Sequence, residues 1–93
     1  MFLNMSIHYP KPEFEQDLID SMRRFGAAAA GAPGLLHAMT TKDETTGRLV
    51  GLMVWTSREA WEAAIERSRA AVAGDDFDLW EEGRPEGFRL HEV

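Results

Sequence analysis

Apolar and polar residues alternate along residues 2–9, the first patterned segment of the chain. One set contains Leu3, Met5, Ile7 and Tyr9, and the other contains Phe2, Asn4, Ser6 and His8. Because successive side chains of a strand point to opposite faces, this period of two predicts a half-buried strand. Pro10 and Pro12 follow it. Proline cannot donate a hydrogen bond to a sheet, so we expect the strand to end there.

Two longer segments carry apolar residues three and four positions apart, which is the spacing of an amphipathic helix. The first is expected to begin at Pro12, to end before Gly31, and to bury Phe14, Leu18, Met22, Phe25 and Ala29. The second follows Thr56 or Ser57, either of which can cap a helix, and repeats at Trp61, Ile65, Ser68 and Val72. A further helical turn with Phe77 and Trp80 is expected after Asp75 or Asp76.

Three more strands are predicted over residues 35–41, 48–55 and 88–93, with a polar hairpin turn at 42–47. The order β-α-β-β-α-β is that of the ferredoxin-like α+β fold, a four-stranded antiparallel sheet with two helices on one face. We expect one domain over residues 1–93. The 48–55 strand is apolar on both faces, yet two helices cover only one face of a sheet. We therefore predict a homodimer in which a second copy covers the other face.

Composition and charge exclude several classes of function. The chain has no cysteine, which excludes disulfides and thiolate metal sites, and its three histidines lack the spacing of a metal site. A net charge of −6 argues against nucleic acid or an anionic membrane as partner. No apolar run approaches the length of a membrane span and no signal peptide is recognisable, so we expect a cytoplasmic protein. The acidic residues Asp75, Asp76, Asp78, Glu81 and Glu82 are expected to form a solvated surface.

Several strings of residues resemble one known family. They are Pro10-Lys11-Pro12-Glu13, Pro33-Gly34-Leu35-Leu36, Gly47-Arg48-Leu49-Val50 and Val54-Trp55-Thr56-Ser57-Arg58-Glu59-Ala60-Trp61. Together they are similar to the antibiotic biosynthesis monooxygenase (ABM) domain, and the likeness extends over nearly the whole chain. The resemblance implies a dimeric α+β barrel. It also implies oxygenation of a small aromatic or phenolic substrate without metal, flavin or other cofactor.

The match to the residues that act in this family is partial. The tryptophan that ends the third strand corresponds to Trp55, and the aromatic residue six positions later, a tyrosine in quinone-forming members, corresponds to Trp61. The family's asparagine before the tryptophan is replaced here by Gly51, and its second-strand tyrosine by Thr40. Two polar groups that handle the substrate oxygen are therefore missing. The haem-degrading branch of the family is a poor match, because no histidine stands near Ala73, where its axial ligand belongs.

The candidate site residues follow from these observations, each beside a plainer structural interpretation. His8 or His37 with Asn4 is the candidate set for moving the substrate's proton, since an imidazole titrates near neutral pH. Each of these residues also suits a hydrogen-bonding role in the sheet or at the dimer interface. The candidate substrate-binding residues are Trp55, Trp61, Gly51 and Met53, although most such tryptophans simply pack a core. A dimer that binds a small aromatic ligand without chemistry remains the alternative function.

Overall fold

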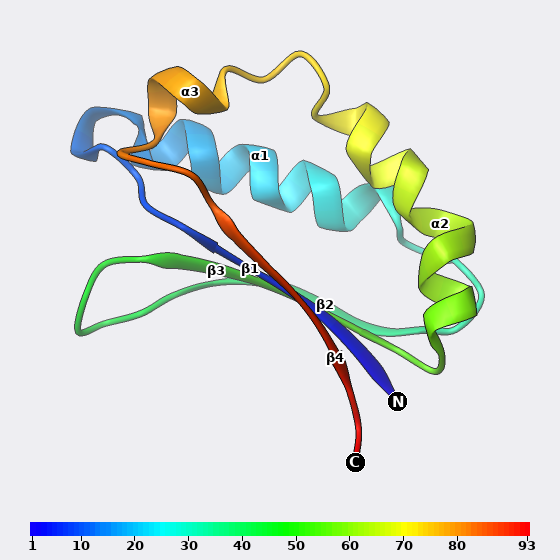
Figure 1. The fold of residues 1–93 in the computed structure, drawn as a ribbon. Coiled ribbons are helices and arrows are strands. Elements are labelled where there is room, and N and C mark those ends of the chain that lie inside the picture. The colour runs from blue at the N-terminus through cyan, green and yellow to red at the C-terminus, as the bar shows by residue number, and fades with distance from the viewer.

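A four-stranded antiparallel sheet forms one layer of the protein, and the helices form the other (Figure 1). The computed structural model describes all 93 residues. Its elements are β1 (Phe2–His8), a 3-10 turn (Pro12–Phe14), α1 (Glu15–Ala28), β2 (Leu35–Lys42), β3 (Leu49–Trp55), α2 (Arg58–Ala71), α3 (Phe77–Trp80) and β4 (Glu86–His91). The ferredoxin-like order and the antiparallel sheet predicted from the sequence are confirmed. No helix is both long enough and apolar enough to span a bilayer.

The strand order is β2-β3-β1-β4, so β1 and β3 lie in the middle of the sheet. Their antiparallel register sets Ser6 of β1 opposite Gly51 of β3, and on the other side of β1 the same residue lies opposite Gly87 of β4. Strand β4 begins and ends two residues earlier than predicted, at Glu86 and His91. The reason is its partner, because β1 offers hydrogen-bonding positions only as far as Phe2, which pairs with His91.

The polar face of β1, rather than its apolar face, lies under the helices. Phe2 is buried and contacts Trp61 of α2, with ring centroids 5.2 Å apart. Asn4, Ser6 and His8 share the face of Phe2, so the polar side of the strand lies under the helices. The apolar side, Leu3, Met5 and Ile7, therefore belongs to the sheet face that carries no helix.

The buried core is divided into two clusters. The larger contains Phe2, Trp55 and Trp61 with residues of α2 and alanines that follow α1, and the smaller contains Leu18, Met22 and Leu49. On the helix side of β3 the order is Leu49, Gly51, Met53 and Trp55, so a residue without a side chain stands between the two clusters. A gap in the packing is the expected result at this point of the sheet.

Helices α2 and α3 begin at capping residues that the sequence predicts. Ser57, one of the two candidate caps of α2, accepts a hydrogen bond from the Ala60 amide, and Asp76 caps α3 by accepting from the Leu79 amide. The predicted stripe of α2 is buried throughout, at Trp61, Ile65, Ser68 and Val72. These helices cover one face of the sheet only (Figure 1).

Candidate functional site

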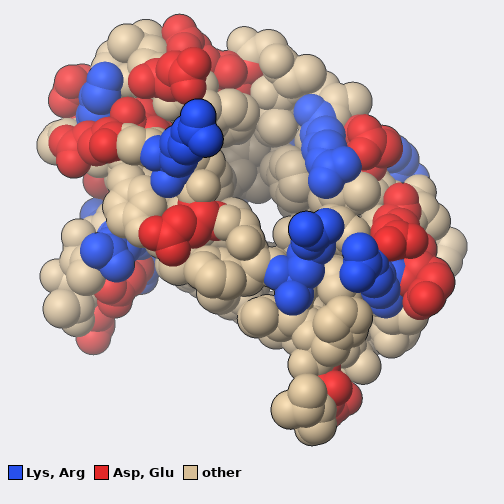
Figure 2. Space-filling model, viewed as in Figure 1, with Lys and Arg blue, Asp and Glu red and all other residues tan.

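A cavity of about 660 Å³ lies between α1 and the sheet, within the usual size range of small-molecule sites. The space-filling view shows the molecule hollowed between the helix layer and the sheet (Figure 2). Its walls are largely apolar and include Met22, Phe25, Ala38, Met53, Val72 and Phe77. Polar groups enter it mainly from β1, where Asn4, Ser6 and His8 stand in one row at two-residue spacing.

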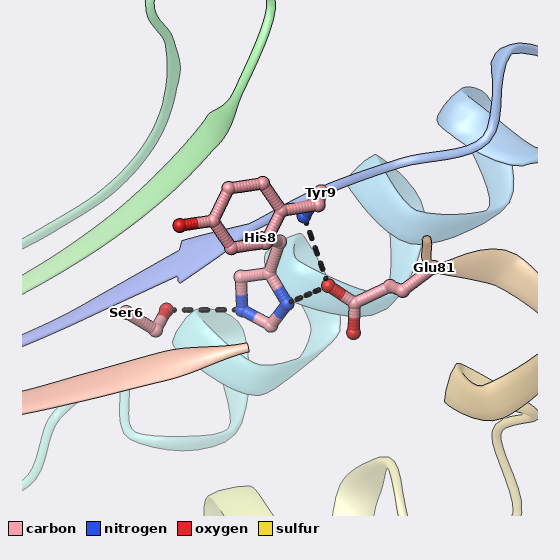
Figure 3. A network of polar contacts seen from close by, with 4 residues as sticks. All are labelled: Ser6, His8, Tyr9 and Glu81. Carbon is pink, nitrogen blue, oxygen red and sulfur yellow. Dashed lines mark hydrogen bonds and ion pairs between the residues drawn. The ribbon is translucent and has the colours of Figure 1, made fainter. Parts of the chain in front are cut away.

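His8 connects this row to a carboxylate from a distant part of the chain (Figure 3). Its Nδ1 lies 3.0 Å from Oε1 of Glu81, and its Nε2 lies 3.1 Å from the hydroxyl oxygen of Ser6. A carboxylate only accepts hydrogen bonds, so Nδ1 carries the proton and donates it. Nε2 of the neutral ring is then an acceptor, which takes the Ser6 hydroxyl proton. The three side chains therefore form one directed chain from Ser6 through His8 to Glu81.

Glu81 is buried, with 1% of its side chain exposed. It follows α3, and its position is fixed by backbone hydrogen bonds: Lys11 donates to the Trp80 carbonyl at 2.9 Å, and Glu82 donates to the Tyr9 carbonyl at 2.8 Å. The Tyr9 amide donates to the same Oε1 at 3.1 Å. The expectation that Glu81 is part of a solvated acidic surface is wrong. Its carboxylate is tied to the end of β1, because a buried charge needs partners of this kind.

A second polar contact involves Glu86, which lines the cavity. The Tyr9 hydroxyl donates to the Glu86 carboxylate at the start of β4, and the Arg48 guanidinium lies 5.0 Å from the centroid of the Tyr9 ring. The hydrogen bond to Glu86, and after it desolvation, raises the pKa of the Tyr9 phenol above its ordinary value. The shift favours the protonated phenol, whose hydrogen bond to Glu86 joins the residue after β1 to β4.

The architecture is shared with solved structures. No family model and no curated protein matches the sequence. The structure of Rv0793 from Mycobacterium tuberculosis superposes with a TM-score of 0.83 at 13% identity, over 99% of this chain and 94% of that one. A crystal structure of an antibiotic biosynthesis monooxygenase superposes with a TM-score of 0.76 at 18% identity, over 100% and 99% of the two chains. The chain has the antibiotic biosynthesis monooxygenase fold.

A further similar structure carries a ligand. It is a variant of MhuD with two manganese protoporphyrin IX molecules in each active site, and it matches with a TM-score of 0.76 at 18% identity, over 100% of this chain and 95% of that one. The resemblance seen in the sequence is therefore confirmed at the level of the fold. Within the ABM fold of this chain, no three His, Asp or Glu side chains come together as a candidate metal site.

The structure brings together four of the predicted site residues and leaves three apart. Asn4, His8, Gly51 and Met53 all line the cavity. His37 is exposed on the edge strand β2, away from the cavity wall. Trp55 and Trp61 are buried in the larger core cluster instead. These two tryptophans therefore do not wall the cavity, since both lie in the core cluster that contains Phe2, and the Trp61 ring packs on the Phe2 ring.

Ser6 and Glu81 were missed by the sequence analysis. Ser6 had a usable signal, because it falls between Asn4 and His8 on the polar side of a strand. Glu81 had none, since it is separated from His8 by 73 positions and stands among other acidic residues. Only the return of the chain after α3 places it behind the imidazole.

Gly51 provides the room that Ser6 needs. A Cβ at position 51 would lie 2.9 Å from the Ser6 hydroxyl oxygen and 3.3 Å from Cε of Met22. Gly51→Ala is therefore expected to push Ser6 off its hydrogen bond to His8 and to destabilise the protein by about 1–3 kcal/mol through overpacking. Imidazole ¹⁵N shifts report the bond, and urea unfolding reports the stability.

Gly87→Ala is the matched control, since Gly87 flanks Ser6 on the opposite strand and a Cβ there meets nothing within 4 Å. It should leave the His8 nitrogen shifts in place. If the two variants behave alike, Gly51 does not act through its contact with Ser6.

Proposed function

We propose that the protein is a cofactor-independent monooxygenase that oxidises a small aromatic or phenolic compound with O₂ in the cavity beneath α1. The single observation that carries the proposal is an imidazole in an apolar cavity, with Nδ1 fixed by a buried carboxylate. This arrangement leaves Nε2 as a base with a defined direction. The monooxygenases that share the fold add support, although their low identities concern the fold alone.

The chemistry begins with loss of a proton from the substrate. A phenol or an acidic CH₂ group that replaces the Ser6 hydroxyl at Nε2 of His8 can transfer its proton there, and Glu81 stabilises the imidazolium that forms. The amide of Asn4, which lines the same cavity two residues before Ser6, is the proposed donor to the developing oxyanion. The electron-rich anion then transfers an electron to O₂. After recombination and loss of water, an anthrone CH₂ group becomes a quinone carbonyl.

The proposed enzyme is a homodimer. The helix-free face of the sheet presents Leu3, Met5 and Ile7 of β1 beside Phe88 and Leu90 of β4, and the last two are 37% and 40% exposed. Val50, Leu52 and Val54 of β3 continue the same face. Apolar faces of this kind on small proteins mark an interaction surface. A second copy is the occupant that matches it, because it brings the same apolar face in a two-fold arrangement.

The test is oxygen uptake by the metal-stripped protein without added flavin. With anthrone or a hydroxynaphthalene, we expect consumption of O₂ together with formation of the corresponding quinone, measured with an oxygen electrode and by absorbance. The same substrates should raise the melting temperature, because binding to the folded state stabilises it. Stabilisation without any turnover would contradict the monooxygenase and support the alternative, a dimer that binds small aromatic ligands.

A further inference from the structure

We propose that Ser6 is a nucleophile that accepts acyl groups, so that the cavity also hydrolyses neutral carboxylic esters. This activity shares His8 with the proposed oxygenation but needs neither O₂ nor an oxidisable substrate. The proposal rests on the hydrogen-bonded chain from Ser6 through His8 to Glu81. Hydrolases with a catalytic triad connect nucleophile, base and orienting acid in the same way.

The distances meet the requirements of such a triad. The Ser6 oxygen is 3.1 Å from Nε2, and Nδ1 is 3.0 Å from the carboxylate, both within hydrogen-bond reach. Glu81 receives a second hydrogen bond from the Tyr9 amide, which holds the carboxylate behind the ring. The imidazole is therefore held with its basic nitrogen toward Ser6 before any substrate enters.

The surroundings of Ser6 leave a path for an ester. Its cross-strand neighbour on β3 is Gly51, where a Cβ would lie 2.9 Å from the hydroxyl oxygen, and its neighbour on β4 is Gly87. Gly87 and Pro85 belong to the cavity wall, and a Cβ at Gly87 would meet only open space. The apolar cavity beyond can receive an uncharged acyl or aryl group.

A donor for the oxyanion stands on the other side of Ser6 from the base. Asn4 is two residues before Ser6 on the same face, about 7 Å away along the strand. Its side-chain oxygen is buried without a hydrogen-bond partner, so that oxygen does not fix the orientation of the amide. The Asn4 amide, the Ser6 hydroxyl and the His8 imidazole therefore follow one another along the same face of β1. A side-chain amide of this kind can stabilise the anion formed when a hydroxyl attacks a carbonyl.

The reaction balances without any oxidant. The Ser6 oxygen bonds to the ester carbonyl carbon while its proton passes to Nε2 of His8. The bond from that carbon to the alcohol oxygen breaks, and His8 returns the proton to the departing alkoxide. Water then gives a proton to Nε2 and attacks the acyl-serine carbon. The bond from that carbon to the Ser6 oxygen breaks, the carboxylic acid departs, and His8 returns the proton to the Ser6 oxygen.

A fluorophosphonate probe tests the nucleophile, with p-nitrophenyl butyrate as the ester substrate. Both assays are run under argon, so that oxygen chemistry cannot contribute. We expect one phosphonyl adduct on the peptide that contains Ser6, and release of nitrophenolate that Ser6→Ala abolishes. His8→Asn keeps a donor toward Glu81 but lacks the base, and it should slow labelling at least about 100-fold. His37→Ala, which changes an exposed histidine outside the cavity, should label at the normal rate.

Two results would overturn the proposal. One is a folded protein that acquires no adduct on Ser6. The other is ester hydrolysis that continues undiminished in Ser6→Ala. Neither result depends on oxygen uptake. The esterase activity can therefore fail its test while the monooxygenase activity passes, and the reverse.

Discussion

Oxygen uptake is expected to fall by a factor of about 100 or more when His8 is replaced by asparagine, since a positioned general base contributes about 10²–10⁴ to a rate. Asparagine is chosen because its amide nitrogen stands near the position of Nδ1 and can still donate to the buried Glu81. His8→Ala would remove that donor as well and would leave a carboxylate buried without its partner. The loss should appear in kcat, because the proton is removed in the chemical step.

The matched control is His37→Ala. His37 was an equal candidate in the sequence, but it is exposed on β2 and lies outside the cavity. Oxygen uptake by this variant should equal that of the unchanged protein. An active His8→Asn protein with an inactive His37→Ala protein would reverse the assignment of the base. Circular dichroism on both variants separates a loss of activity from a loss of fold.

Leu90→Glu is expected to convert the homodimer into monomers at micromolar concentration. Leu90 lies on the helix-free face of β4, opposite Leu3 of β1, and is 40% exposed in the single chain. Each dimer would bury two new carboxylates in an apolar interface. A charge buried without a partner costs several kcal/mol, so we expect the dissociation constant to rise at least about 100-fold. Sedimentation equilibrium measures the change directly.

Leu79→Glu serves as the control for this prediction. It makes the same substitution at a leucine of α3 that is 46% exposed, but on the helix layer rather than on the open sheet face (Figure 1). This variant should remain a dimer. If Leu90→Glu sediments as a dimer too, the second copy does not lie on the helix-free face of the sheet.

Most of the fold could be predicted from local patterns. The alternation in β1, the three-and-four spacing in α1 and α2, and the capping by Ser57 and Asp76 each depend on neighbours within a few positions. Element ends were less accurate, and β4 shows why. Its limits are set by the length of β1, a partner whose paired residues lie 79 to 89 positions earlier in the chain.

The site was predictable only in part. Period two separates Asn4, Ser6 and His8 from Leu3, Met5 and Ile7, but it does not say which set faces the helices. Burial of apolar groups would favour the apolar set under the helices. In the structure the polar set lies under α1 instead, and the apolar set lies on the open face of the sheet. Glu81 could not be recognised, since its burial depends on how the chain returns after α3.

The most direct measurement is the ¹⁵N spectrum of the histidine rings in the metal-free protein under argon, with and without saturating anthrone. The chain has three histidines, so each ring can be followed separately. We predict that the Nε2 signal of His8 moves toward the imidazolium position when anthrone is added, whereas the signals of His37 and His91 stay in place. An unmoved His8 signal at saturating anthrone would contradict the claim that this imidazole takes the substrate's proton in the cavity.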